Sequence, residues 1–416
     1  MRLGPLAQRA GLFHNNATPT LFRFGPVTQA ADHVYHLVRA LLAARGADDA
    51  GIISGAGQAL LQAHFSDADD RLCDALVAEA EHNGVAPLLA PMVAACADRS
   101  PAFGRLDRSF AALAHRHRRA AAVREAAVDE LLGAYAAAGV PVLLLKGAAL
   151  AHLIYPSPAL RPMVDIDLLV DAADARTAAA VARKLGFVFA PAYESRFAGR
   201  MHHLPVANVK RANFHIKLEI HTDAIAADLG GSLTMASLMD GPQPVVRPGG
   251  PQGHALGHTD MLRHLARHAF VPVNRVRLIH LYDLWRYQAK FRDAIDWPAL
   301  CALSPSVGVA LDLVSACFVD GGPSDAGRGM LPLADIATLN GFSVKLDALF
   351  NPPAWWMRGF YGIAPGKSLL ACRLLTHPAM MSRWIAKRLL VGLAGARPVF
   401  DLDELGHNDQ VARIGR

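Results

Sequence analysis

Two aspartates, Asp165 and Asp167, stand one residue apart in the apolar run VDIDLLV. A carboxylate inside an apolar strand is costly unless a cation or a hydrogen-bond donor meets it. Side chains alternate between the two faces of a strand, so both carboxylates project from the same face. By the same rule Glu219 lies on the polar face of the later segment FHIKLEIHT. If the two strands share a sheet, the three carboxylates can converge.

Three oxygen donors on a rigid sheet suit Mg²⁺ or Mn²⁺, hard cations that keep water and substrate phosphates as their remaining ligands. A pair of such ions can activate a hydroxyl group and stabilise the leaving oxygen in nucleotidyl transfer. The sequence therefore predicts that Asp165, Asp167 and Glu219 are catalytic residues and metal ligands, with a nucleoside triphosphate (NTP) as the substrate. The structural alternative for Glu219 is an exposed position on an amphipathic strand.

The phosphates of an NTP need cationic or N–H-rich partners. The segment LLKGAAL offers Lys146, Gly147 and the start of a helix. Gly147 lets the backbone approach an anion closely, and a helix N-terminus favours negative charge. Lys146 and Arg161 can neutralise phosphate charge, Arg161 through two parallel hydrogen bonds. Each has an alternative, because Lys146 can pair with one of the aspartates and Arg161 can cap a loop or bridge to an acid.

These motifs resemble those of the uncharacterised nucleotidyltransferase family within the DNA-polymerase-β-like superfamily. The resemblance covers roughly residues 120–290 and is most specific at Lys146–Gly147, Tyr155, Arg161, Asp165 and Asp167. It implies a small mixed sheet flanked by helices, with Asp165 and Asp167 as metal ligands and Glu219 as the third carboxylate. The superfamily's usual glycine–serine turn is replaced here by Gly147 and Ala148, so no hydroxyl side chain helps to hold the phosphates.

Apolar spacing predicts the elements that would position these residues. Residues 32–46, 70–84 and 109–139 show helical periodicity and end at glycine. Beyond residue 139 the pattern predicts buried strands at 140–147 and 163–170, helices at 148–155 and 173–186, a hairpin of 202–210 with 213–222, and later helices at 254–270 and 275–291.

The predicted fold is therefore α+β, with a small mixed-sheet nucleotidyltransferase core flanked by N-terminal and C-terminal helical regions. The predicted parts are a flexible leader (1–27), an N-terminal helical region (28–138), the nucleotidyltransferase core (139–222), a helical acceptor-side lobe (223–345) and a basic, apolar C-terminal extension (346–416).

Several other polar residues have structural interpretations. His221 shares the polar face with Glu219 and is interpreted as a hydrogen-bonding neighbour rather than a base. Asp283 is interpreted as a structural hydrogen-bonding residue rather than a group that contacts the acceptor. Two histidine pairs have the i, i+4 spacing that can bind zinc but lack the acidic partner of an H-E-x-x-H motif: His254/His258 and His264/His268.

Composition limits the class of protein. The 416 residues are 52% hydrophobic and 19% charged, which is typical of a folded chain. Five scattered cysteines without a CxxC pair argue against a disulfide framework and a thiolate zinc site. The chain has neither an uncharged apolar window of about 18 residues nor a signal-peptide core, so we expect no transmembrane helix and a cytoplasmic location.

The sequence leaves the partner of the reaction open. The net charge of +6 suits an anionic ligand, although solubility explains it equally well. The acceptor could be a small molecule, RNA or a protein, and a non-catalytic nucleotide-sensing protein is a further alternative. Residues 382–395 are amphipathic and basic, so weak contact with a membrane surface is an alternative to docking on the protein's own core. The oligomeric state is equally open.

Overall fold

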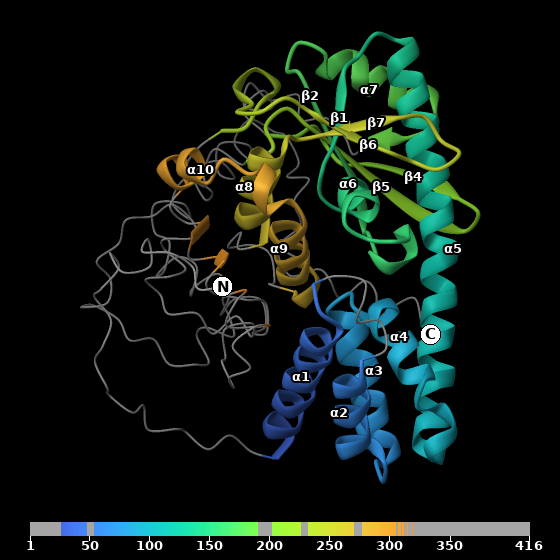
Figure 1. The fold of residues 1–416 in the computed structure, drawn as a ribbon. Coiled ribbons are helices and arrows are strands. Elements are labelled where there is room, and N and C mark those ends of the chain that lie inside the picture. The colour runs from blue at the N-terminus through green and yellow to red at the C-terminus, as the bar shows by residue number, and fades with distance from the viewer. Residues whose placement is uncertain are drawn as a thin grey trace, which may run out of the picture.

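The computed structural model describes residues 26–47, 54–189, 202–225, 232–269 and 277–304, with single residues up to 318. Within them the chain forms the predicted α+β fold (Figure 1): N-terminal helices, then a mixed sheet of seven strands, then further helices. All but two residues of the predicted leader, and the whole predicted C-terminal extension with its amphipathic segment, lie outside the described residues.

Helices form the N-terminal part of the chain. Ser54 and Asp69 cap two of them, because each side chain accepts a hydrogen bond from a backbone N–H of the first turn. The helices predicted within 32–46, 70–84 and 109–139 are confirmed, and α2 and α4 are additional. The bounds are α1 (Pro26–Arg45), α2 (Gly55–Phe65), α3 (Asp70–His82), α4 (Ala86–Ala94), η3 (Ala97–Arg99) and α5 (Pro101–Ala137).

The 37-residue helix α5 connects the N-terminal helices to the sheet (Figure 1). Near its start it packs on α3 and α4, and near its end it packs on α7. There the Tyr135 hydroxyl donates to the Ala178 carbonyl at 3.4 Å. Between these contacts the basic stretch 115–120 is mostly exposed, as expected for a solvated helix face.

The described sheet has the strand order β3-β4-β5-β2-β1-β7-β6. β2 pairs in parallel with β5 and antiparallel with β1, and β1 pairs in parallel with β7. The predicted hairpin is confirmed as β4 and β5, joined by Ala212 and Asn213, both with positive φ as a two-residue hairpin turn requires. The bounds are β1 (Val142–Leu144), β2 (Asp165–Val170), β3 (Val188–Phe189), β4 (Ala207–Arg211), β5 (Phe214–His221), β6 (Gln243–Val245) and β7 (Gly253–Ala255).

The sheet takes in residues that the sequence assigned to the helical lobe. β6 and β7 form an antiparallel pair, and Ala255 of β7 is the register partner of Leu144 in β1. The helix predicted at 254–270 is present as α8, but its predicted start at residue 254 was wrong, since α8 begins at His258. Strands of three residues are too short to show a period of two, which is why the pattern missed them. The bounds of the five predicted parts stay predictions.

Further helices surround the sheet. α8 and α9 pack on each other, and α9 lies between the sheet and the N-terminal helices (Figure 1). The Tyr282 hydroxyl of α9 donates to the Gly46 carbonyl at 2.7 Å, which ties α9 to the end of α1. The bounds are α6 (Lys146–Leu153), η4 (Pro158–Leu160), α7 (Ala175–Lys184), η7 (Met235–Ser237), α8 (His258–Ala269), α9 (Leu278–Phe291), η8 (Arg292–Ala294) and α10 (Trp297–Leu303).

Within the part of the chain that the structure describes, no helix is both long and apolar enough to cross a membrane. Cys73 and Cys96 are buried free thiols, and Cys301 is an exposed one. Cys317 and Cys372 lie outside the described residues.

Candidate metal and nucleotide site

The parallel pairing of β2 with β5 places the candidate carboxylates next to each other. Asp167 is the register partner of Glu219, and Asp165 is the partner of Lys217. Paired residues of neighbouring strands project from the same face, so all four side chains share one face. The opposite face is fully buried and apolar, with Ile166, Leu168, Leu218 and Ile220. The two strands are therefore neighbours, which is the condition on which the predicted convergence depended.

Lys146 forms an ion pair with Asp167. Its ammonium group donates to Asp167 Oδ1 at 2.7 Å, and both side chains are largely buried. Lys146 is the first residue of α6, and its φ of 44° lies in the left-handed region. Non-glycine residues in that region are strained and cluster at functional sites. The alternative considered for Lys146 was an ion pair with one of the aspartates, and the structure contains this pair. The pair keeps the lysine beside the carboxylates.

His221 completes a close group with Asp167 and Glu219. Its Nε2 donates to Asp167 Oδ1 at 3.0 Å and lies 3.4 Å from Glu219 Oε2. Each of the three residues offers one potential ligand atom, and these atoms lie within 4.8 Å of one another. Asp165 is outside this group. The sequence did not assign His221 to the metal site, although its position two residues after Glu219 puts it on the same face of the strand.

The electrostatic environment distinguishes the two aspartates. Burial, together with the charges of Asp167 and Glu219, raises the pKa of Asp165 to about 7. Burial acts in the same direction on Asp167, but the Lys146 ammonium and the hydrogen bond from His221 outweigh it and hold the pKa of Asp167 well below its usual range. Asp167 is therefore ionised and already paired, whereas Asp165 makes no hydrogen bond or ion pair with the residues that the structure describes.

The other charged groups follow the same balance. Burial opposes the charged form of Lys146, yet the carboxylates of Asp167, Glu219 and Asp165 raise its pKa. Burial likewise opposes protonation of His221, but its hydrogen bonds to Asp167 and Glu219 raise its pKa. For Glu219, the His221 hydrogen bond outweighs burial and lowers the pKa. The carboxylates of Asp167 and Glu219 and the cationic groups of Lys146 and His221 thus stabilise one another in their charged forms, whereas the pKa of Asp165 is raised.

Gly147 lies in the first turn of α6, where this helix packs against the segment that precedes β2. A Cβ atom at this position would lie 2.6 Å from Cγ of Met163 and 3.0 Å from its Sδ. The close approach that requires glycine here is therefore with the protein itself, at a residue two positions before Asp165. The predicted contact of this turn with phosphate stays a prediction.

Arg161 is engaged away from the carboxylate face. Its guanidinium donates to both oxygens of Asp283 at 2.7–3.0 Å and to the Pro162 carbonyl at 2.6 Å. The Tyr155 hydroxyl donates to the same carboxylate at 2.7 Å. Arg161 thus takes the alternative role of a bridge to an acid, and the structure does not bring it to the aspartates as a free phosphate ligand. Asp283 has a structural hydrogen-bonding role, as the sequence suggested.

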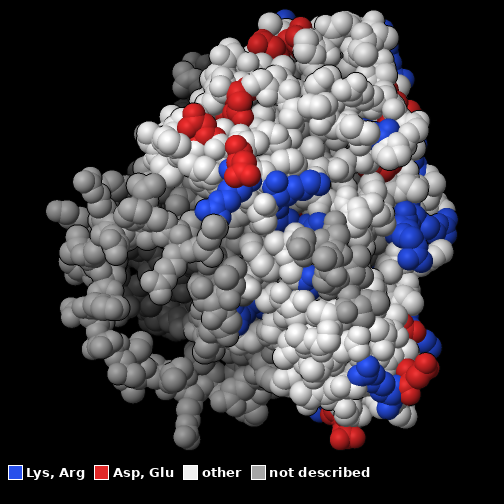
Figure 2. Space-filling model, in the orientation of Figure 1, with Lys and Arg blue, Asp and Glu red and all other residues white. Residues whose placement is uncertain are grey.

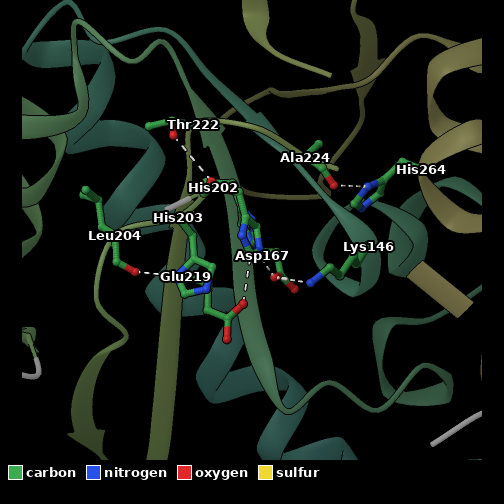
Figure 3. A network of polar contacts seen from close by, with 10 residues as sticks. Lys146, Asp167, His202, His203, Leu204, Glu219, Thr222, Ala224 and His264 are labelled. Carbon is green, nitrogen blue, oxygen red and sulfur yellow. Dashed lines mark hydrogen bonds and ion pairs between the residues drawn. The ribbon is translucent and has the colours of Figure 1, made fainter. Parts of the chain in front are cut away.

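The two histidine pairs do not form a metal-ligand group among the described residues. His254 is exposed on β7, and the ring of His258 lies against Phe291 with centroids 4.4 Å apart. His264 and His268 stack with centroids 6.1 Å apart. The Nδ1 atom of His264 donates to the carbonyl that follows β5 at Ala224, 2.9 Å away (Figure 3).

Comparison with known proteins identifies the family of this chain. Residues 69–318, more than half of the chain, match the family described as "Uncharacterised nucleotidyltransferase". The chain belongs to this family. No curated protein matches the sequence. Among solved structures, the solution structure of the antibiotic-resistance factor ANT(2'')-Ia matches with a TM-score of 0.32 and 16% identity, covering 46% of this chain and 96% of that chain.

Proposed function

We propose that this protein is a metal-dependent nucleotidyltransferase that moves a nucleoside monophosphate from an NTP to an acceptor hydroxyl group. The observation that carries the proposal is the register of β2 and β5, which pairs Asp167 with Glu219 and keeps Asp165 on the same face. Three carboxylates on adjacent strands form a rigid oxygen-donor surface, and membership of a nucleotidyltransferase family agrees with that chemistry.

The residues of this surface fit a divalent cation. Asp165 is a largely enclosed carboxylate without a hydrogen bond or ion pair among the described residues, and Asp167 already holds one cationic group, the Lys146 ammonium. Mg²⁺ or Mn²⁺ held by Asp165, Asp167 and Glu219 would supply charge neutralisation for the triphosphate and a lowered pKa for the acceptor hydroxyl.

The chain's own groups would then position the substrates. Lys146 donates a hydrogen bond to Asp167. It could transfer this bond to a phosphate oxygen of an NTP, because the phosphates of a metal-bound NTP would lie beside Asp167. The backbone at Gly147 and the N-terminus of α6 face an anion favourably. In the reaction, the acceptor oxygen forms a bond to the α-phosphorus. At the same time the bond breaks between the α-phosphorus and the oxygen that bridges it to the β-phosphorus. Pyrophosphate leaves with the electron pair of that bond, and the hydroxyl proton passes to solvent.

Two alternatives find less support. Lys and Arg side chains on the face in Figure 2 form separate groups with uncharged surface between them, rather than one continuous basic groove for RNA. A non-catalytic nucleotide sensor would be supported by a Glu219 turned away from Asp165. The Glu219 carboxylate lies in one close group with Asp167 and His221, and its charge contributes to the raised pKa of Asp165.

The test uses the full chain with Mg²⁺ or Mn²⁺, each α-labelled NTP and a cell extract as the source of acceptors. We expect label transfer with release of pyrophosphate. We also expect its loss in Asp165→Asn and in Asp167→Asn, with transfer reduced by about 100-fold or more. NTP binding without transfer under any acceptor would support the sensor instead. Label on RNA would support the RNA-modifying alternative. Unchanged metal-dependent nucleotide binding in both variants would contradict the proposed site.

A further inference from the structure

We infer that His221 is itself a metal ligand through Nε2, and that this imidazole makes the site select Mn²⁺ or a similar first-row transition ion over Mg²⁺. The inference rests on the proposed function only in assuming that the carboxylate face holds a divalent cation. It extends the ligand set beyond the three carboxylates and names the class of metal.

The distances within the group support the assignment. His221 Nε2 lies 3.0 Å from Asp167 Oδ1 and 3.4 Å from Glu219 Oε2. Adjacent ligand atoms around one ion, each about 2.1–2.2 Å from it, are separated by roughly 3 Å. His221 Nε2 therefore lies at the spacing of neighbouring coordination positions from one oxygen of each carboxylate, and the three potential ligand atoms lie within 4.8 Å of one another. The described residues contain no second group of this kind.

His221 lies in the protein interior. Its side chain is 4% exposed and Asp167 is 2% exposed, so the imidazole lies inside the protein against two carboxylates. It is the last residue of β5, where Leu169 of β2 is its register partner on one side and His203 forms an isolated β-bridge with it on the other. A buried imidazole held by the sheet has little freedom to leave the carboxylates, and so it remains in reach of any cation that they bind.

The state of the second ring nitrogen does not oppose the assignment. His221 Nδ1 is buried and has no hydrogen-bond partner in the structure. In the imidazolium, as in a metal complex bound through Nε2, Nδ1 carries a proton, so the same N–H lacks a partner in both states. The cost of that unpaired atom is therefore common to both states. Exchange of the Nε2 proton for a cation keeps the negative charges of Asp167 and Glu219 compensated.

Ligand chemistry then determines which cation is preferred. Mg²⁺ takes oxygen ligands almost throughout, whereas imidazole suits first-row transition ions. Carboxylates alone would discriminate weakly between Mg²⁺ and Mn²⁺. A nitrogen ligand added to them raises affinity for Mn²⁺ more than for Mg²⁺. A His221 that only positioned Asp167 through a hydrogen bond would instead affect both ions alike.

The first experiment titrates the full chain with MnCl₂ and with MgCl₂, without nucleotide, by calorimetry. We expect the ratio of the Mg²⁺ dissociation constant to the Mn²⁺ dissociation constant to fall by about tenfold or more in His221→Gln. His203→Gln is the matched control, because its ring packs 5.5 Å from that of His221 but it is not in the ligand group. A ratio unchanged in a folded His221→Gln, or equal losses for both ions, would overturn the inference.

The second experiment includes a readout on the wild-type chain, which does not depend on the folding of a variant. Pulsed electron paramagnetic resonance of Mn²⁺ bound to the wild-type chain reports a directly coordinated ¹⁴N nucleus. We expect this nitrogen coupling in the wild type and in His203→Gln, and its loss in His221→Gln. Bound Mn²⁺ without nitrogen coupling, or no Mn²⁺ binding at all, would refute the assignment.

The two proposals fail in different ways. Nitrogen-coordinated Mn²⁺ together with no nucleotidyl transfer would remove the proposed function and leave the metal assignment intact. Nucleotidyl transfer with a metal that shows only oxygen ligands would support the proposed function and remove the assignment of His221 as a ligand.

Discussion

Arg161 and Asp283 form a buried ion pair that joins the segment before β2 to α9. Their side chains are 9% and 2% exposed, and both carboxylate oxygens of Asp283 accept hydrogen bonds from the Arg161 guanidinium. The two residues are separated by 122 positions in the sequence. Arg161 stands four positions before Asp165, so this pair anchors the chain that leads into the carboxylate strand.

We expect Asp283→Asn to lower the free energy of unfolding by about 3–5 kcal/mol, because the substitution leaves the Arg161 charge buried without its counter-ion. Urea unfolding of the full chain measures the change. The matched control is Arg105→Met, which removes ion pairs with two exposed carboxylates, Asp70 and Asp74, and should change the unfolding midpoint much less. Equal effects of the two substitutions would show that burial does not strengthen the Arg161–Asp283 pair.

Lys146→Met should have opposite effects on metal and nucleotide. The ammonium group lies 2.7 Å from Asp167 Oδ1, so it competes with any cation that this carboxylate binds. Its removal should tighten Mn²⁺ binding by about 10- to 100-fold in the absence of nucleotide. NTP turnover should fall, since a phosphate-neutralising group is lost. Calorimetry and the label-transfer assay measure the two effects.

The control for Lys146→Met is Lys210→Met, which removes an exposed lysine of the neighbouring strand β4. It should change neither quantity. Weaker Mn²⁺ binding in Lys146→Met, with the fold retained, would mean that the lysine supports the metal site instead of competing with the metal.

Gly147→Ala should destabilise the protein by about 1–3 kcal/mol, because the added Cβ would overlap Cγ of Met163. Combining it with Met163→Ala should cost less than the sum of the two single changes, since the shorter side chain makes room. A double-mutant cycle by urea unfolding gives the coupling. Gly133→Ala in α5 meets no atom within 4 Å and should stabilise by about 1 kcal/mol. Strict additivity at 147 and 163 would contradict the packing argument.

We expect the free energy of unfolding to decrease at acidic pH because of the buried histidines. Burial, with a contribution from the Lys146 charge, lowers the pKa of His264 to about 3 from an ordinary value of 6.5. Between those values the unfolded chain binds a proton that the folded chain does not, so the free energy of unfolding decreases as pH falls from 6.5 towards 3. Burial also lowers the pKa of His268 and His280, which adds to the effect.

Urea unfolding at pH 7.5 and pH 5 tests this dependence. His264→Asn can keep a hydrogen bond to the Ala224 carbonyl while removing the titrating ring, so it should reduce the loss of stability at pH 5. His254→Asn changes an exposed histidine and should leave the pH dependence as in the wild type. A wild-type stability that is constant between the two pH values would contradict the prediction.

Much of the fold followed from local patterns. The helices α3 and α5 were predictable because each carries several turns of regular apolar spacing. The β4–β5 hairpin was predictable because its strands are long enough to alternate. β6 and β7 were not, since three residues show no period, and only their pairing with β1 through Ala255 and Leu144 makes them strands.

The sequence by itself determined that Asp165 and Asp167 interrupt an apolar run and that Glu219 lies on the polar face of an alternating strand, because alternation along a strand is a local property. Only the tertiary structure decided which groups meet. His221 reaches Asp167 across 54 positions of sequence, and Arg161 turns to Asp283 rather than towards the aspartates. Strand register and helix packing set such contacts through the burial of the whole core, and no spacing within one segment encodes them.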